Sequence, residues 1–250
     1  MKTLTHLMLL AGLVGAPLVA AAESPHTLAF NVGATTDYVF RGVSQTQNGP
    51  AIQGGVDYSH TSGLYAGFWA SNVSWVNEGT PGGYKDNNSM ETDFYGGYKG
   101  SVGGVGYDIG LIRYYYPGDD ITGVTSPDTT EVYVAGSWKF LTLKYSYAIS
   151  DYFIAWGGPG AKSKGSGYLE LNATYDLGNG WGLLGHLGHQ KVENTGIASY
   201  TDWKLGVTKD VGIGVVTLAY TDTDADTPTY TWNGDEVADG RAILSFSKSF

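Results

Sequence analysis

Apolar and polar residues alternate with a period of two along most of this 250-residue sequence. In residues 141–149 (LTLKYSYAI), every odd position is apolar or aromatic, and every even position is polar or small. Residues 131–138 and 168–176 also alternate, with valine and tryptophan at even positions in the first and leucine at odd positions in the second. Because successive side chains of a β-strand point to opposite faces, the pattern predicts strands with one apolar and one polar face. An all-β fold is therefore expected.

Twelve segments carry the alternation, and we predict strands at residues 27–40, 50–60, 63–76, 89–99, 105–116, 129–138, 141–153, 167–177, 181–192, 199–209, 213–221 and 241–250. The connections alternate between short turns and long loops. Short periplasmic turns and long extracellular loops are typical of bacterial outer-membrane barrels. The sequence thus predicts one closed antiparallel transmembrane β-barrel of about twelve strands, covering residues 23–250, with both ends on the periplasmic side.

Composition agrees with a sheet that faces lipid on one side. Charged residues make up only 15% of the chain, against about a quarter in soluble domains. The mean hydropathy of −0.14 is nevertheless too polar for a bundle of membrane helices. There is no cysteine, and the formal net charge is −10. These values exclude a disulfide framework and argue against nucleic acid as a partner.

The N-terminus has the features of a secretory signal peptide. Lys2 provides a positive charge, residues 4–14 are apolar, and Ala20 to Ala22 provide small residues at a cleavage position. We expect residues 1–22 to be removed before Glu23. The alternative, a retained membrane anchor, would need about 20 apolar residues. The predicted location is the outer membrane of a Gram-negative bacterium, with lipid and lipopolysaccharide as surroundings.

The apolar positions predict which side chains face lipid. No water is present in the hydrocarbon core to pair a free strand edge, so the sheet has to close. The predicted outward set is Leu28, Phe30, Val32, Ile52, Val56, Phe94, Val132, Val134, Leu143, Leu169, Leu171, Leu205, Val207, Leu218, Leu244 and Phe246. Aromatic residues expected in the interfacial belts are Trp75, Trp138, Trp181, Trp203, Tyr38 and Tyr58.

The C-terminal residues 242–250 alternate and end on phenylalanine. This segment resembles the signal that the barrel-assembly machinery recognises in outer-membrane proteins, with Phe246 and Phe250 as its aromatic residues. The alternative is the last strand of a soluble β-sandwich. So many aromatic residues along one face favour the barrel.

Residues 35–46 (TTDYVFRGVSQT) resemble the opening block of the TorF-type outer-membrane porin family of proteobacteria. Residues 180–188 (GWGLLGHLG) and 200–210 (YTDWKLGVTKD) are similar to later blocks of that family. The resemblance covers nearly the whole chain after residue 22. It implies an outer-membrane barrel that acts as a channel.

With the apolar residues outward, fifteen charged residues are predicted to face the lumen. They are Asp37, Arg41, Asp57, Glu91, Asp93, Lys99, Asp108, Glu131, Lys139, Lys144, Glu170, Asp176, Asp202, Lys204 and Arg241. Nine are acids and six are bases, so a pore would favour cations. The alternative is a lumen filled by salt-bridged side chains. Asp37 and Arg41, four apart on one predicted strand, should share a face.

Two long loops are candidates for a segment folded into the lumen: the glycine-rich residues 157–160 and residues 222–240. The second contains Asp222, Asp224 and Asp226 but lacks the glycine and glutamate of a calcium loop. His186 and His189 fall on opposite faces of a strand, so they cannot share a metal. No metal site and no cofactor are predicted.

The sequence therefore predicts a porin-like channel for passive diffusion of ions or small solutes, with a mild cation preference. One alternative is a structural or adhesive barrel with a plugged lumen. Another is an outer-membrane lipid hydrolase, for which His189 is the one outward histidine in a suitable place. No G-x-S-x-G and no H-E-x-x-H motif occurs, so an enzyme is not expected.

Overall fold

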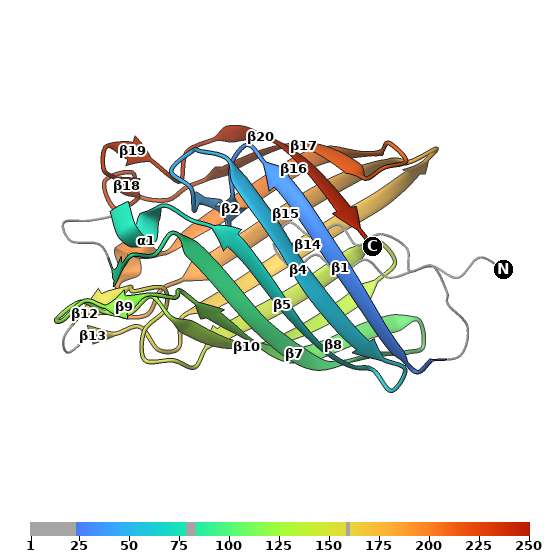
Figure 1. Ribbon diagram of the computed structural model, residues 1–250, viewed down its shortest axis with the longest axis horizontal. Coiled ribbons are helices and arrows are strands. Elements are labelled where there is room, and N and C mark those ends of the chain that lie inside the picture. The colour runs from blue at the N-terminus through green and yellow to red at the C-terminus, as the bar shows by residue number, and fades with distance from the viewer. Residues whose placement is uncertain (1–23, 79–83, 159–160) are drawn as a thin grey trace.

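The computed structural model describes residues 24–78, 84–158 and 161–250, and these form a closed barrel of twelve antiparallel strands (Figure 1). Each strand pairs with the barrel strands that precede and follow it, and β1 closes the ring with β20. The strands are β1 (His26–Thr35), β4 (Ala51–His60), β5 (Leu64–Asn72), β7 (Met90–Val102), β8 (Val105–Tyr115), β10 (Thr129–Trp138), β11 (Leu141–Ala148), β14 (Gly167–Gly178), β15 (Trp181–Lys191), β16 (Tyr200–Asp210), β17 (Val215–Thr223) and β20 (Arg241–Ser249). The predicted fold is confirmed.

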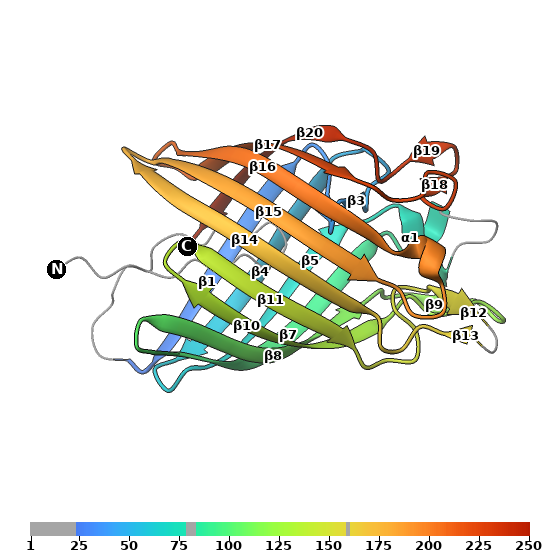
Figure 2. The same cartoon turned by 180° about the vertical axis from the view of Figure 1, so that it is seen from behind.

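The connections differ in length at the two ends, as predicted (Figures 1 and 2). Tight turns join the strands at the end where β1 begins and β20 ends. The long connections gather at the other end and contain β2 (Val39–Phe40), β3 (Val43–Ser44), α1 (Trp75–Glu78), β6 (Lys85–Asp86), β9 (Asp119–Asp120), β12 (Gly157–Gly158), β13 (Ala161–Lys162), η1 (Gly196–Ala198), β18 (Thr231–Trp232) and β19 (Asp235–Glu236). None of the helices in the described part of the chain combines the length and apolar character needed to cross a bilayer. The predicted signal peptide lies outside the described residues.

Three predicted strands extend too far at the end with the long loops. β1 ends at Thr35, β5 at Asn72 and β11 at Ala148. Alternation continues past these points because extended loop segments also place successive side chains on opposite sides. Beyond Thr35 the chain leaves the sheet and forms the hairpin β2–β3, which pairs only with itself.

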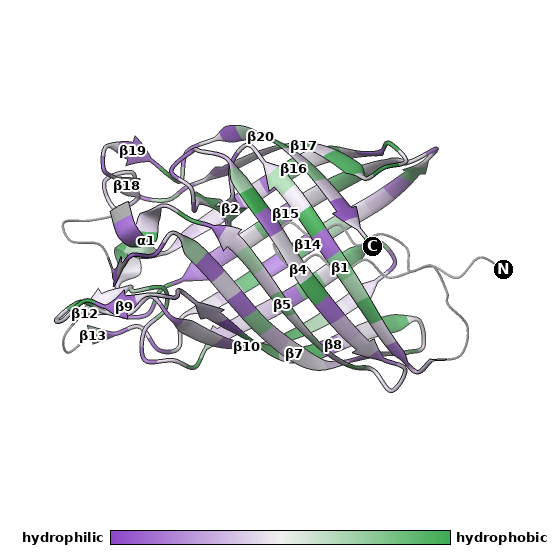
Figure 3. Cartoon of the chain, viewed as in Figure 1, coloured by the Kyte–Doolittle hydropathy of each residue, from purple (hydrophilic) through white to green (hydrophobic). Residues whose placement is uncertain are grey.

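The outer face of the barrel is apolar, and apolar and polar segments alternate along the strands in Figure 3. Fourteen of the sixteen residues predicted to face outward are exposed. Val56 and Phe246 are partly covered but share that face, because they pair with Phe30 and Ala34.

The aromatic belt prediction is only partly right. Trp138, Trp181 and Trp203 are exposed on the outer face. Trp75 and Tyr38 are buried, each 3% exposed, in a cluster at the end of the barrel with the long loops. They lie in loop segments that fold inward, so their predicted place in the belts is wrong.

Tyrosine rings on the inner face pack over glycines of neighbouring strands. Gly97 pairs directly with Tyr65, and a Cβ atom on Gly97 would lie 2.6 Å from the tyrosine Oη. Gly110 pairs in the same way with Tyr133, with 2.5 Å to the Oη. Such pairs give a physical reason for the 38 glycines and 19 tyrosines of the chain, since each ring lies in the space that a missing side chain leaves.

The C-terminal phenylalanine closes the ring. The Phe250 amide donates to the Phe30 carbonyl at 2.8 Å, and the Phe30 amide donates back at 3.2 Å. The Lys248 Nζ lies 4.7 Å from the centroid of the Phe250 ring. Recognition of Phe246 and Phe250 by the assembly machinery remains a prediction.

Candidate functional site in the barrel lumen

The hairpin β2–β3, called the inner hairpin here and defined as residues 39–44, reaches the inner wall of the barrel. Its two turn residues, Arg41 and Gly42, have φ values of 49° and 80°, the pattern of a two-residue turn that twists with its strands. Arg41 Nη1 and Nη2 donate to the two carboxylate oxygens of Glu131 on β10, at 3.0 and 2.7 Å. Nη1 also donates to Gln190 Oε1 on β15 at 2.8 Å. The hairpin tip is thus tied to two separate strands.

Aromatic rings surround the Arg41 guanidinium. Its Cζ lies 4.3 Å from the ring centroid of Tyr168 and 4.7 Å from that of Phe40. The side chains of Arg41 and Glu131 are 6% and 1% exposed. A planar guanidinium suits this combination of a bidentate carboxylate contact and stacking, which a lysine could not reproduce. Removing either partner would leave a buried charge without compensation.

The base of the inner hairpin is held at Asp37. Asp37 Oδ1 accepts from Ser44 Oγ at 2.6 Å and from Thr46 Oγ1 at 3.1 Å. Its Oδ2 accepts from Arg241 Nη1 of β20 at 3.0 Å. The expectation that Asp37 and Arg41 share a strand face is wrong, because the chain leaves the sheet after Thr35 and each residue pairs elsewhere.

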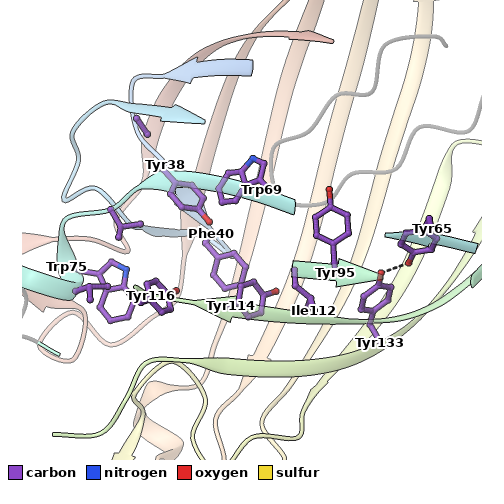
Figure 4. Close-up of a cluster of buried hydrophobic side chains, with 13 residues drawn as sticks. Tyr38, Phe40, Tyr65, Trp69, Trp75, Tyr95, Ile112, Tyr114, Tyr116 and Tyr133 are labelled. Carbon is purple, nitrogen blue, oxygen red and sulfur yellow. Dashed lines mark hydrogen bonds between the residues drawn. The ribbon is translucent and has the colours of Figure 1, made fainter. Parts of the chain in front are cut away.

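A pair of buried acids lies on β7, on the aromatic side of the lumen. Glu91 accepts hydrogen bonds from Tyr38 Oη at 3.1 Å and Tyr116 Oη at 3.3 Å. Asp93 is 6% exposed, and its Oδ1 has no hydrogen-bond partner. Figure 4 shows Tyr38, Phe40, Trp69, Tyr114 and Tyr116 among the clustered side chains of this region. The carboxyl groups of Glu91 and Asp93 therefore interact with one another and lie beside aromatic rings, with no cationic partner for Asp93 among the described residues.

The other side of the lumen carries mixed charges. His186 Nε2 lies 2.7 Å from Asp202 Oδ2, and Tyr168 Oη donates to Asp202 Oδ1 at 2.8 Å. Lys144 Nζ lies 3.6 Å from Glu170 Oε1. Lys204 has neither an ion pair nor a hydrogen bond to its side chain within the described residues.

These groups enclose a cavity, called the lumen cavity, of about 90 Å³ open to the centres of water molecules. The inner hairpin contributes Phe40, Arg41 and Gly42 to its lining, and the wall contributes Asp93, Lys204 and others. Such a volume holds several waters, since one needs about 10–15 Å³ on this measure. A second cavity of about 70 Å³, on the other side of Phe40, is lined mainly by aromatic side chains of the long loops.

Nearer the short turns, tyrosines hold further acids on the wall. Tyr65 Oη donates to Asp108 at 2.6 Å and also contacts Tyr133 Oη. Tyr95 Oη donates to Asp57 at 2.5 Å.

The strand pairing places most of the predicted lumen residues on the inner face. Asp57, Glu91, Asp93, Lys99, Asp108, Glu131, Lys144, Glu170, Asp176, Asp202, Lys204 and Arg241 project from barrel strands, whereas Asp37 and Arg41 reach the interior from the segment after β1. The prediction that Lys139 faces the lumen is wrong. Lys139 lies in a tight turn, and its Nζ lies 4.2 Å from the ring centroid of Trp138, which faces outward. That the others line a conducting pore remains a prediction.

The segment folded into the lumen is not either of the two predicted. Residues 39–44 fill that position, and β12 pairs with β13 among the long connections. Residues 159–160 of the first candidate lie outside the described residues. From the second candidate, Tyr230 and Trp232 line the aromatic cavity. Sequence reasoning missed this because it continued the strand through Phe40. The Arg41-Gly42 step, flanked by Phe40 and Val43, was the available hairpin signal.

Among the described residues, no three histidine, aspartate or glutamate side chains are placed to hold one metal ion. His189 faces outward with its Nδ1 3.1 Å from Thr201 Oγ1. No serine is hydrogen-bonded to it within the described part of the chain.

Gly42→Ala is expected to destabilise the barrel by about 1–3 kcal/mol, the cost of a non-glycine residue in a left-handed conformation. A Cβ atom there would also lie 2.5 Å from Thr223 Cγ2 and 2.7 Å from Asp202 Cβ. Unfolding in denaturant measures the change. Gly103→Ala is the matched control, because Gly103 has φ +59° but no atom within 4 Å of its added Cβ. Equal losses for the two variants would contradict close packing of the hairpin tip.

The sequence model of a family described as "Bacterial protein of unknown function (Gcw_chp)" matches residues 19–250. No curated protein matches the sequence.

Among solved structures, the chain is similar to a KdgM porin in complex with disordered oligogalacturonate, with a TM-score of 0.53 and 10% identity over 89% of this chain and 99% of that chain. A NanC porin gives a TM-score of 0.48 and 11% identity over 88% and 98% of the two chains. The COG4313 outer membrane channel from Pseudomonas putida F1 gives a TM-score of 0.46 and 13% identity over 94% of this chain and 100% of that chain. The first likeness shows that the barrel has the fold of an outer-membrane porin.

Proposed function

The chain belongs to the Gcw_chp family of bacterial proteins of unknown function, and we propose that it is a porin-like outer-membrane channel for passive diffusion of ions or small solutes. The observation that carries this proposal is a closed twelve-stranded barrel with an apolar outer face and a charged interior that contains a cavity. A closed sheet with that polarity satisfies its backbone in lipid and offers polar groups to a solute. Diffusion through it needs no cofactor and no catalysis.

Planar-bilayer recording tests this function. The purified barrel, inserted from detergent into a planar bilayer in KCl, is expected to give stepwise current. A barrel that inserts, as judged by protease protection in vesicles, but gives no steps would refute the channel.

We also propose a mild preference for cations. With Lys139 excluded, nine carboxylates and five Lys or Arg side chains point to the interior. Fixed negative charge raises the local concentration of cations.

The reversal potential in a KCl gradient is therefore expected to show selectivity for potassium, and Asp93→Asn is expected to reduce it. Asp151→Asn is the matched control, since Asp151 is exposed in a long loop and bonds Lys162 at 2.7 Å. An anion-selective wild type, or an unchanged potential in the Asp93 variant, would count against the preference.

A second candidate is a structural or adhesive barrel whose lumen stays closed. The buried contacts of Arg41 with Glu131 and Gln190 favour it, because they fix a hairpin across the interior. The same recordings separate the two functions. An outer-membrane lipid hydrolase has less support, because within the described residues the one side-chain hydrogen bond of His189 is to a threonine hydroxyl.

The remaining parts of the proposal concern biogenesis and surroundings. We propose export through the cleaved segment 1–22, assembly guided by Phe246 and Phe250, and a final place among outer-membrane lipid and lipopolysaccharide. Membership in the narrower TorF-type group is proposed on the residue 35–46 block.

A further inference from the structure

Asp93 is an acid with an unfilled hydrogen-bonding position in the lumen cavity. It is 94% buried, lines the cavity and interacts with Glu91 on the same strand, but its Oδ1 has no hydrogen-bond partner among the described residues. Its direct cross-strand neighbours are Trp69 on β5 and Tyr114 on β8. A carboxylate between aromatic rings is a suitable environment for an ammonium group, which gains both Coulomb and cation–π attraction.

Lys204 lines the same cavity, and its side chain has no ion pair or hydrogen bond within the described residues, although Asp202 and Glu170 attract its charge from farther away. The acids nearest to it are already engaged, Asp202 by His186 and Tyr168 and Glu170 by Lys144. Its cross-strand neighbours are His186 and Thr221. The Lys204 ammonium is therefore available to a carboxylate.

The two groups lie on opposite walls. In the ring, β7 and β16 are separated by six steps in either direction. On one side, a solute in the cavity thus meets the Asp93 carboxyl group, which interacts with Glu91 but with no cation among the described residues. On the other side it meets the Lys204 ammonium group, which has no ion pair or hydrogen bond there.

We propose that the lumen cavity binds a small zwitterionic solute, with its ammonium group at Asp93 and its carboxylate at Lys204. This deepens the proposed channel function by naming a class of solute. With water alone, Asp93 would have no cationic partner, and Lys204 would have only the longer-range attraction of Asp202 and Glu170. A simple cation would satisfy Asp93 but would leave Lys204 unpaired.

Isothermal titration calorimetry on the full barrel in detergent tests the proposal. The probes are glycine, β-alanine, 4-aminobutyrate and 6-aminohexanoate, which differ in charge separation, with butylammonium and butyrate as one-charge analogues. At least one amino acid is expected to bind about tenfold more tightly than both analogues, a difference of about 1.4 kcal/mol. Asp93→Asn and Lys204→Met should each remove that advantage.

Lys204→Arg, which keeps the charge, should retain most of the advantage, and Lys139→Met in the turn should change nothing. Thermal unfolding confirms that each variant is folded. Equal affinity for an amino acid and butylammonium, no binding of any probe, or full binding by the two charge-removing variants would overturn the proposal. Titration does not depend on current, so the two proposals can fail separately. Absence of amino acid binding would leave the KCl conductance unaffected, whereas a barrel that binds amino acids but carries no current would refute only the channel.

Discussion

Arg41→Met is expected to lower the free energy of unfolding by about 3–5 kcal/mol and to raise the single-channel conductance. The substitution leaves Glu131, whose side chain is 1% exposed, without its bidentate partner. Breaking one side of a buried ion pair has a cost of this size. Glu131 then becomes hydrated, and the tip of the inner hairpin loses its attachment to β10 and β15. Denaturant unfolding and planar-bilayer recording measure the two effects.

Arg113→Met is the matched control for this variant. Arg113 Nη2 bonds Asp128 at 3.1 Å, but its side chain is 40% exposed and projects from the outer face of β8. Loss of that pair should cost no more than about 1 kcal/mol and leave conductance unchanged. A double variant, Arg41→Met with Glu131→Leu, should recover part of the lost stability, because no buried charge remains. Wild-type conductance in the Arg41 variant would show that the hairpin does not limit the path.

Leu218→Arg is expected to destabilise the barrel in lipid vesicles by about 2–4 kcal/mol, provided that its outer face is in the hydrocarbon core. Leu218 is 58% exposed near the middle of β17 and pairs with Val207 and Leu244 on the same face. Refolding from denaturant into vesicles of a short-chain phosphatidylcholine, followed at increasing denaturant concentration, measures this change.

Thr217→Arg, one residue away, supplies the comparison. Thr217 points inward and pairs with Thr208 and Ser245, so an arginine there would have polar neighbours. The Thr217→Arg variant should lose clearly less stability than the Leu218→Arg variant. Similar losses at both positions would mean that the outer face is not in lipid, and the proposed location would then be wrong.

The barrel could be predicted from sequence because one physical rule acts at every strand. An outward residue such as Leu205 meets an apolar environment, and its neighbour Lys204 meets a polar one, so the alternation itself records the fold. The inner hairpin could not be predicted in the same way. Tyr38 and Phe40 continue the alternation of β1, and their burial depends on contacts with β7, β8 and other distant strands.

The candidate site shows the same division. Strand parity alone predicts that Asp93 and Lys204 face inward, but it does not predict that neither of them forms an ion pair within the described residues. Pairing of Arg41 with Glu131, 90 positions along the chain, depends on the closed ring and on the turn that carries Arg41 inward. Local pattern identifies the faces of the strands, and three-dimensional closure decides which charges neutralise one another.

The tyrosine–glycine pairs bear on how such a barrel reaches the right arrangement while it closes. A strand shifted by two residues still points its apolar side chains toward lipid, so hydropathy alone does not disfavour the wrong register. In a displaced pair of β5 and β7, however, the Tyr65 ring would meet a side chain in place of Gly97. Steric overlap would then destabilise the shifted register wherever such a pair occurs. The tyrosine–glycine pairs would in this way favour the correct strand register during assembly.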